Sequence, residues 1–309
     1  MRDEVPRISV IVPAYDEAEN MPELFAELAA TFATHELSAE VVLVDDGSTD
    51  GTAGAAAEAA AAAGLEDAVV LSHRTNRGKT EAMLTASEAA RGDYLVLFDA
   101  DLQHSTEEIP RFAAMLDDGY DVVAGRKIGR YEKRFVSSVY NRLARAIFRV
   151  PVRDLNSMKA FRADVLDGLT LRHDWHRYLV VLAHAEGYRL GELDIELHPR
   201  RHGQAKFSGR RRILVGMLDL VSVWFLLIFG RKPLLFFGTT GLALIAAGGL
   251  TGIGALVLRF GFGLGYRPLL TLVLLLVVGG LLLFILGFLA EMMAQMRDEL
   301  EELRRERRP

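Results

Sequence analysis

Short apolar runs alternate with longer helix-like segments through the first 125 residues of the chain. The apolar runs are rich in β-branched residues and cover 8–13, 40–44, 68–72, 94–98 and 121–124. Helix-like segments occupy 17–32, 49–63 and 79–90, and the second is rich in alanine, the strongest helix former. Apolar strands that alternate with helices are typical of a parallel sheet covered on both faces. The pattern therefore predicts an α/β fold with a mainly parallel sheet and flanking helices.

The chain ends in two long apolar stretches. Residues 234–258 and 268–290 contain no charged residue, and each exceeds the roughly 20 residues that cross about 30 Å of hydrocarbon. The glycine-rich segment 260–265 joins them. Two such stretches with a short connection indicate a transmembrane hairpin rather than a pair of buried core helices.

The run 213–229 is also nearly apolar, but it contains Asp219 and follows three arginines at 210–212. It could be a third span or a helix that lies in the membrane interface. With two spans, Arg231, Lys232 and the arginine-rich tail all lie on the cytoplasmic side, as the positive-inside rule prefers. A third span would place the tail outside. The charge distribution therefore favours an interfacial helix.

These patterns divide the chain into four parts. We expect a cytoplasmic α/β domain over 1–207, a juxtamembrane interfacial helix over 208–232, a transmembrane hairpin over 233–290 and a charged cytoplasmic tail over 291–309. The charged N-terminus leads directly into a strand without a signal peptide, so the chain is expected to be a multi-pass membrane protein whose first domain stays in the cytoplasm. The tail has apolar residues at helical spacing, which fit either a homo-oligomer contact or a helix on the headgroups.

The composition narrows the chemistry. The formal net charge of -5 does not suit a general nucleic-acid binder, which is usually basic, so no nucleic-acid partner is expected. The chain contains no cysteine, which excludes disulfides, thiolate metal sites and cysteine nucleophiles.

Polar segments follow three of the predicted strands. They are 13–17, 45–48 and 99–104, and each begins where an apolar run stops. Ligands of open α/β sheets bind beyond the carboxyl ends of the strands. The coincidence of three such segments predicts a ligand site at that edge.

The segment after the fourth strand has the pattern of a metal site. Asp99 and Asp101 are two residues apart, so in extended backbone both side chains point the same way. Carboxylate oxygens suit Mg²⁺ or Mn²⁺, and Gln103 can add a neutral oxygen. The alternative for an isolated motif of this length is a solvated acidic turn.

Asp45 and Asp46 end another apolar strand and precede Gly47 and Ser48. One interpretation is turn chemistry, with Ser48 or Thr49 as the cap of the next helix. The other is a carboxylate that accepts hydrogen bonds from a base or a ribose. The two are compatible.

The motifs V-P-A-Y-D-E, V-D-D-G-S-T-D-G-T and D-A-D-L-Q-H, in this order, resemble those of the family 2 glycosyltransferases with the GT-A nucleotide-sugar-binding fold. The resemblance runs from Ile8 to about Phe207 and is greatest to the polyprenyl-phosphate hexosyltransferases, the dolichyl-phosphate mannosyltransferase group. It implies an inverting transfer of a hexose from a nucleotide sugar to dolichyl or undecaprenyl phosphate. GDP-mannose is the first expected donor and UDP-glucose the next.

The resemblance implies roles for the first two motifs. Pro13, Tyr15 and Glu17 would contact the nucleotide, with Tyr15 beside the base. Asp45 or Asp46 would bind the base or the ribose.

The third motif would carry the metal. Asp99 would lie near the ribose and the metal, and Asp101 and Gln103 would be ligands of Mg²⁺ or Mn²⁺. Residues 74–79 match the loop that passes the donor, which assigns Lys79 to the nucleotide sugar.

The second half supplies cations. In the resembling enzymes, arginines matching Arg126 and Arg134, with a serine matching Ser138, hold the acceptor phosphate, and a guanidinium fork suits that role. Residues 200–206 resemble an R-x-x-G-x-S-K loop that closes over the donor diphosphate, which assigns Arg200 and Lys206 to the donor, although Ala205 replaces the usual serine. The residues expected to act directly in catalysis are Asp99, Asp101, Arg126 and Lys206.

Two segments match less closely. Residues 154–162 resemble a D-x-x-S-G-F-R segment in which Met158 and Lys159 replace the usual glycine, which leaves the sugar specificity open. His176 matches an H-R-[FY] pattern, and we expect a buried, hydrogen-bonded histidine there. A processive polysaccharide synthase is a rival reading, but it usually has more spans and a Q-x-x-R-W motif. A non-catalytic membrane scaffold with a sugar-nucleotide fold is the other.

Overall fold

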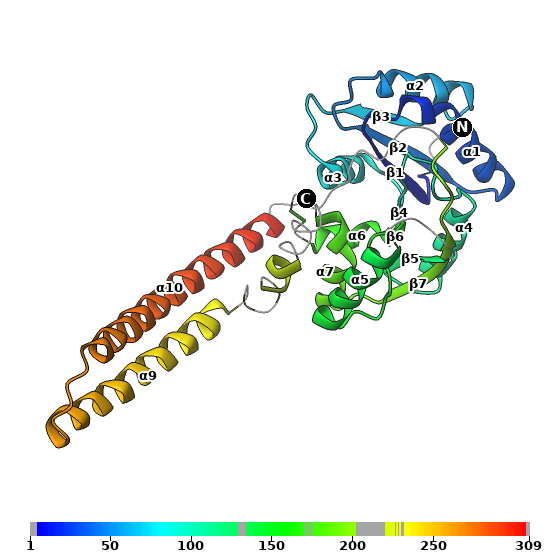
Figure 1. The fold of residues 1–309 in the computed structure, drawn as a ribbon. Helices are drawn as coiled ribbons and strands as arrows, with labels where there is room; N and C mark the ends of the chain where they lie inside the picture. The colour runs from blue at the N-terminus through cyan, green and yellow to red at the C-terminus, as the bar shows by residue number, and fades with distance from the viewer. Residues whose placement is uncertain are drawn as a thin grey trace. The chain divides into compact units, whose positions relative to one another are not determined.

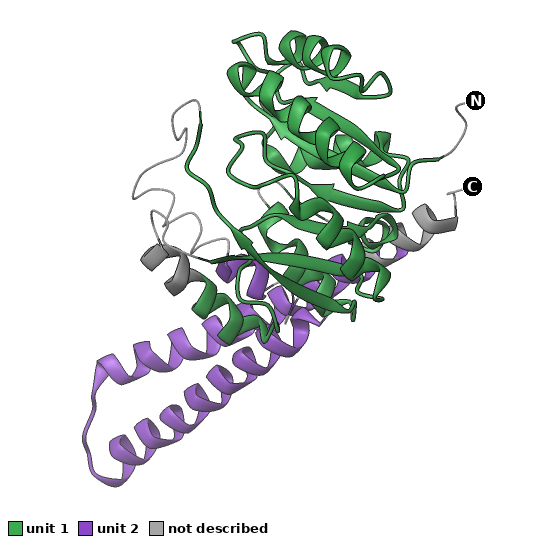
Figure 2. Cartoon of the chain, turned by 90° about the vertical axis from the view of Figure 1, so that its right-hand side faces the viewer, with its two compact units in different colours: residues 1–209 green, residues 210–309 purple. Residues whose placement is uncertain are grey.

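The computed structural model describes residues 5–128, 134–169, 171–172, 175–201, 220–225, 227, 229 and 232–306. The chain forms two compact units, Met1–Gly209 and Arg210–Pro309, shown in green and purple in Figure 2. The expected end of the α/β domain at residue 207 lies outside the described residues.

The described part of the first unit contains one seven-stranded sheet in the order β3-β2-β1-β4-β6-β5-β7 (Figure 1). The strands are β1 (Ile8–Ala14), β2 (Ala39–Asp45), β3 (Val69–Ser72), β4 (Tyr94–Leu97), β5 (Val122–Ile128), β6 (Lys159–Arg162) and β7 (Leu190–Glu196). Neighbouring strands are parallel except β6, which runs antiparallel to both β4 and β5. The predicted, mainly parallel sheet is confirmed, and the antiparallel β6 is an addition to it.

Helices flank this sheet (Figure 1). They are α1 (Met21–Thr34), α2 (Thr52–Ala62), α3 (Lys79–Ala89), α4 (Glu108–Asp117), α5 (Arg134–Phe148), α6 (Ala163–Asp167) and α7 (Leu179–Ala185), with short 3₁₀ helices η1 (Ala18–Asn20) and η2 (Trp175–Tyr178). The three helices predicted before residue 90 are present, and each begins or ends within a few residues of its expected position.

Both faces of the sheet are buried. Val10 and Val12 of β1 belong to a core cluster with Phe25 of α1 and Phe112 of α4. Ile11 points to the opposite face, because neighbouring strand residues alternate, and it is also fully buried. Alternate residues of one strand therefore pack on different layers, which explains why β1 and β2 are mainly apolar.

The second unit is built on two long helices, α9 (Pro233–Gly261) and α10 (Arg267–Glu306). Each is long and apolar enough to cross a membrane. Their backbones approach closely, since a Cβ on Gly241 would lie 2.5 Å from the carbonyl oxygen of Gly280. α10 continues to Glu306, so the tail expected over 291–309 begins as part of the same helix. Most of the run 213–229 lies outside the described residues.

Candidate active site

Backbone hydrogen bonds bring the three polar segments to the same edge of the sheet. Asp46 N donates to Ala14 O at 2.8 Å, and Phe98 N donates to Ile11 O at 3.0 Å. The carboxyl ends of β2, β1 and β4 therefore lie side by side in this order. The predicted meeting of 13–17, 45–48 and 99–104 is confirmed.

Side chains hold the first two segments together. Ser48 Oγ accepts from Asp16 N at 2.8 Å, and Thr49 N donates to Asp16 Oδ1 at 2.8 Å. The prediction that Ser48 or Thr49 caps the next helix is therefore wrong. α2 begins at Thr52, whose N–H donates to Asp50 Oδ1 at 3.0 Å, because Ser48 and Thr49 are used in joining the two loops.

Asp46 is buried and holds the loop that follows β3. Its Oδ1 accepts from Arg77 N at 2.8 Å and contacts His73 Nδ1 at 2.7 Å, and its Oδ2 accepts from Gly78 N at 2.7 Å. Both carboxylate oxygens are thus occupied by groups of the protein. The geometry gives Asp46 a positioning role for the loop that ends at Lys79.

Asp45 and Gly47 complete this turn. Asp45 Oδ1 accepts from Ser48 N at 3.0 Å, and the side chain is almost fully buried. Gly47 has φ of +75°, and a Cβ there would lie 2.6 Å from the backbone of Thr75. Only glycine permits this approach of the two loops.

The first motif is fixed by β1 and η1. Pro13 lies within β1 opposite Val44 of β2, and Tyr15 follows the strand as a half-buried residue. Glu17 accepts from Asn20 Nδ2 at 2.5 Å. These three predicted nucleotide contacts therefore lie together at the carboxyl end of β1.

Lys79 and Asp99 form an ion pair, Nζ to Oδ1, at the start of α3 and the end of β4. Partial burial tends to raise the pKa of the Asp99 carboxyl, but the charge and hydrogen bond of Lys79 outweigh it, so the pKa lies well below its usual value. The side chains are 33% and 39% exposed. Exposed pairs contribute about 0–1 kcal/mol, so a phosphate could replace Asp99 as the partner of Lys79 at small cost.

Asp101 pairs with Arg200, whose Nη2 lies 2.7 Å from Asp101 Oδ2. Burial and the nearby negative charge of Asp99 raise the pKa of Asp101 to about 6, against the opposing charge of Arg200. The two carboxylates therefore lie close enough to repel each other. Positive charge brought between them would relieve that repulsion.

The donor set at this edge fits a divalent cation. Asp99 and Asp101 supply carboxylate oxygens, and Gln103 lies beside them, with its backbone N donating to Asp101 Oδ1 at 3.3 Å. Among the described residues there is no cluster of three or more His, Cys, Asp or Glu that could hold a metal. Mg²⁺ typically binds one or two carboxylates together with substrate phosphates, so two carboxylates suffice for a site that is completed by a diphosphate.

Arg126 of β5 makes a two-pronged ion pair with Asp194, its partner in register on β7. β5 continues past the apolar run 121–124 to Ile128, so Arg126 lies inside the strand. Glu192 also lies 4.0 Å from Arg126 Nη1. The guanidinium is thus held in a fixed orientation by β7.

The structure describes the remaining residues expected to bind phosphate only in part. The backbone places Arg134 and Ser138 in the first turns of α5, where helix N–H groups favour anions. Their side chains, and Lys206, lie outside the described residues.

The burial of the polar side chains of His104, Asp154 and Lys159 was not predicted from the sequence. Asp154 accepts from Asn141 Nδ2 at 3.2 Å, and Lys159 is buried in β6. Burial lowers the pKa of His104 to about 4. The signal in the sequence was a lysine between Met158 and an apolar Ala-Phe pair, at a position where a strand would bury it.

His176 is hydrogen-bonded as expected. Its Nδ1 and backbone N each lie 3.1 Å from Thr80 Oγ1. Burial lowers its pKa well below the usual value, so the ring is neutral. It connects η2 to α3, the helix that begins at Lys79.

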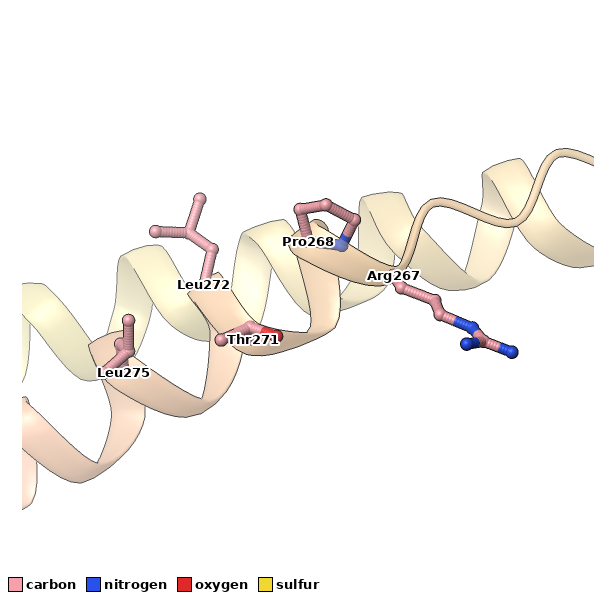
Figure 3. Close-up of a pocket in the computed structure, with 5 residues that line it drawn as sticks. All are labelled: Arg267, Pro268, Thr271, Leu272 and Leu275. Carbon is pink, nitrogen blue, oxygen red and sulfur yellow. The ribbon is translucent and has the colours of Figure 1, made fainter.

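An open hollow of the second unit lies along the start of α10 (Figure 3). It is lined by Arg267, Pro268, Thr271, Leu272 and Leu275. One helix supplies the whole lining, and Arg267 is its single charged group. It has neither the carboxylates nor the paired cations of the edge described above and is not part of that site.

Known proteins resemble this chain in sequence. The glycosyl transferase family 2 profile matches residues 9–176. An undecaprenyl-phosphate 4-deoxy-4-formamido-L-arabinose transferase of Klebsiella pneumoniae is 33% identical over 263 residues, covering 84% of this chain and 78% of that protein. A dodecaprenyl-phosphate galacturonate synthase of Rhizobium johnstonii is 32% identical over 301 residues, covering 93% and 88%.

Solved structures share the fold. Glucosyl-3-phosphoglycerate synthase of Mycobacterium tuberculosis, solved with Mn²⁺, UDP-glucose and phosphoglyceric acid, has a TM-score of 0.54 and 20% identity. The matched region covers 70% of this chain and 80% of the mycobacterial chain. The likeness supports the GT-A architecture of the sheet and its flanking helices.

Proposed function

The chain belongs to glycosyl transferase family 2, in the group that acts on polyprenyl phosphates, and we propose that it transfers a hexose from a nucleotide sugar to a polyprenyl phosphate. The observation that carries the proposal is the arrangement of Asp99 with Lys79 and Asp101 with Arg200 at one edge of the sheet. Two carboxylates suit a metal, and two adjacent cations suit the diphosphate that such a metal would bind.

When the donor binds, Lys79 and Arg200 would exchange their carboxylate partners for its diphosphate. Its diphosphate replaces the carboxylates beside Lys79 and Arg200, which leaves Asp99 and Asp101, with Gln103, to hold Mg²⁺ or Mn²⁺. A bound divalent ion would stabilise the negative charge that grows on the leaving diphosphate. Pro13, Tyr15, Glu17 and Asp45 would contact the nucleoside. Asp46 acts through the loop that positions Lys79.

Transfer requires one displacement. An oxygen of the lipid phosphate attacks the anomeric carbon, the bond from that carbon to the diphosphate breaks, and the nucleoside diphosphate leaves with inversion. The phosphate is already an anion at neutral pH, so no strong general base is required. The protein must hold two anions in line, which can lower the barrier by several kcal/mol. Arg126, Arg134 and Ser138 would hold the acceptor, while Arg200 and Lys206 would take up the charge of the leaving group.

The membrane-embedded acceptor explains why the chain carries two long apolar helices. A polyprenyl chain stays in the bilayer, so its phosphate must be met at the membrane surface. We propose that α9 and α10 cross the membrane as a hairpin, with segment 208–232 in the interface and residues 1–207 and 291–309 on the cytoplasmic side. The acceptor would be undecaprenyl or dolichyl phosphate.

A donor panel tests the function. GDP-mannose and UDP-glucose come first, followed by donors of the sugars carried by the two relatives above. Purified full-length protein is given each labelled donor, polyprenyl phosphate and Mg²⁺ or Mn²⁺, and label is counted in the organic extract. Label from one donor supports the proposal. Donor binding without lipid label from any donor would indicate the non-catalytic scaffold instead.

A further inference from the structure

Lys159 is a buried cation that the proposed transfer does not use. It begins β6, in register with Leu97 of β4 and Ala124 of β5, and is only 2% exposed. Lysine is almost never fully buried unless it is paired. Its place in the middle of the sheet therefore calls for a partner.

The protein supplies only part of that partnership. Lys159 Nζ donates to Ser157 O at 2.9 Å, and no carboxylate of the described residues lies within 4.0 Å of it. Burial, reinforced by the charge of Lys79, lowers the pKa of Lys159 to about 7. A buried ammonium without an anion is costly, and a ligand anion would remove that cost.

Two neighbouring groups also lack partners. Ser157 Oγ and His104 Nδ1 are buried and have no hydrogen-bond partner among the described residues, and both residues are less than a tenth exposed. Most buried polar atoms in native proteins are hydrogen-bonded. Ser157 is also the residue whose carbonyl oxygen accepts from Lys159 Nζ, and His104 directly follows Gln103 at the catalytic edge. A bound group at this end of β4 would supply the missing bonds.

The strand register places Lys159 next to the catalytic edge, because Lys159 pairs with Leu97 of β4, two residues before Asp99. His104 and Lys159 are both influenced by the charges of Asp99, Lys79, Asp154 and Lys127. Asp99 belongs to the edge proposed to hold the donor and the metal. The unpaired atoms thus lie close to where the transferred sugar and the acceptor phosphate would meet.

We propose that Lys159, with Ser157 and His104, forms a subsite for an anionic oxygen of a substrate. The inference rests on the proposed transfer and adds a specificity-determining residue to it. An anionic oxygen has two sources in this reaction, a carboxylate on the donor sugar and the phosphate of the polyprenyl acceptor. The Lys159 ammonium binds either in the same way.

The test uses Lys159→Met, which removes the charge and keeps the length, and Lys159→Arg, which keeps the charge. Arg162→Gln is the matched control, because Arg162 lies at the exposed end of the same strand and pairs with Asp164. Donors are compared in pairs that differ only at C6, UDP-glucose with UDP-glucuronate and GDP-mannose with GDP-mannuronate. Donor affinity is measured by calorimetry, transfer by lipid label, and folding by thermal denaturation.

If Lys159 binds a carboxylate on the donor sugar, the wild type should bind a uronate donor at least tenfold more tightly than the matching neutral donor. Lys159→Met should abolish this preference. If Lys159 binds the acceptor phosphate, Lys159→Met should raise the KM for polyprenyl phosphate about 10- to 100-fold, equally with both donors of a pair. The free energy of a hydrogen bond to a charged group corresponds to a change in affinity of about that size. In each case Lys159→Arg recovers part of the loss.

The inference is overturned if Lys159→Met has wild-type melting, donor affinities and acceptor KM. A purely structural role would also overturn it. In that case Lys159→Arg and Lys159→Met lose stability equally, and the folded protein that remains keeps the wild-type ratio of uronate to neutral donor binding and the wild-type acceptor KM. Failure of the proposed function would look different, because the wild type itself would then label no lipid while the calorimetric arm still reports on Lys159.

Discussion

Asp46→Asn should weaken the fold and the donor site together. In the wild type, Oδ1 accepts from Arg77 N and contacts His73, and Oδ2 accepts from Gly78 N. An asparagine has one acceptor oxygen. Whichever way its amide is turned, its NH₂ group faces a backbone N–H that can only donate, so one bond is lost and one buried N–H is left unpaired.

The magnitude follows from these contacts. A hydrogen bond to a charged group contributes roughly 1.5–3 kcal/mol, and a buried unpaired donor costs about 1–3 kcal/mol. The expected loss in free energy of unfolding is therefore about 2–4 kcal/mol. For a domain of this size each kcal/mol lowers Tm by roughly 2–4 °C, so a decrease of about 5–15 °C is expected.

Thermal denaturation and donor binding are measured on the same preparations. Asp67→Asn is the control, because Asp67 is an exposed aspartate just before β3. We expect Asp46→Asn to lower Tm and weaken donor binding at least tenfold, since the loop carrying Lys79 loses its anchor. An Asp46→Asn protein with wild-type Tm and altered nucleotide preference would refute this account and make Asp46 a direct contact to the base.

Three further predictions concern packing, capping and the acceptor. Gly280→Ala should destabilise the α9–α10 hairpin by about 1–3 kcal/mol, because its Cβ would lie 2.6 Å from Gly241 O, whereas Gly279→Ala meets nothing within 4 Å; equal unfolding midpoints in detergent for the two variants would contradict this. Glu291→Ala should lower the stability of the hairpin by about 0.5–2 kcal/mol in the same measurement, because Leu234 N at the start of α9 donates to Glu291 Oε2 at 3.0 Å. Glu299→Ala is the control, and an unchanged unfolding midpoint of Glu291→Ala would show that Glu291 does not cap α9. Arg126→Ala should raise the KM for polyprenyl phosphate at least tenfold and the donor KM by much less, and equal changes in both would count against an acceptor role.

Much of the edge was predictable because it depends on local sequence. Apolar runs that stop at Pro13, Asp45 and Phe98 locate three strand ends, and parallel strands must bring such ends to one side. The two long helices of the second unit are equally local. Length and the absence of charge predict them without any knowledge of packing.

Long-range partners could not be predicted in the same way. The role of Asp46 depends on backbone N–H groups of a loop about thirty residues away, and the orientation of Arg126 depends on the register of β5 with β7. β6 is a four-residue antiparallel strand whose place between β4 and β5 is fixed only by the finished sheet. The burial of Lys159 is a consequence of that placement.

The most direct test compares the wild type with Asp101→Ala, using the best donor of the panel, polyprenyl phosphate and Mn²⁺, and then repeats both with a chelator. We predict that the wild type forms glycosyl-phosphoryl lipid only with the metal, that metal re-addition restores it, and that Asp101→Ala forms none while melting near the wild-type temperature. Near-normal lipid product from Asp101→Ala, or from the wild type in chelator, would contradict the proposed metal and diphosphate site.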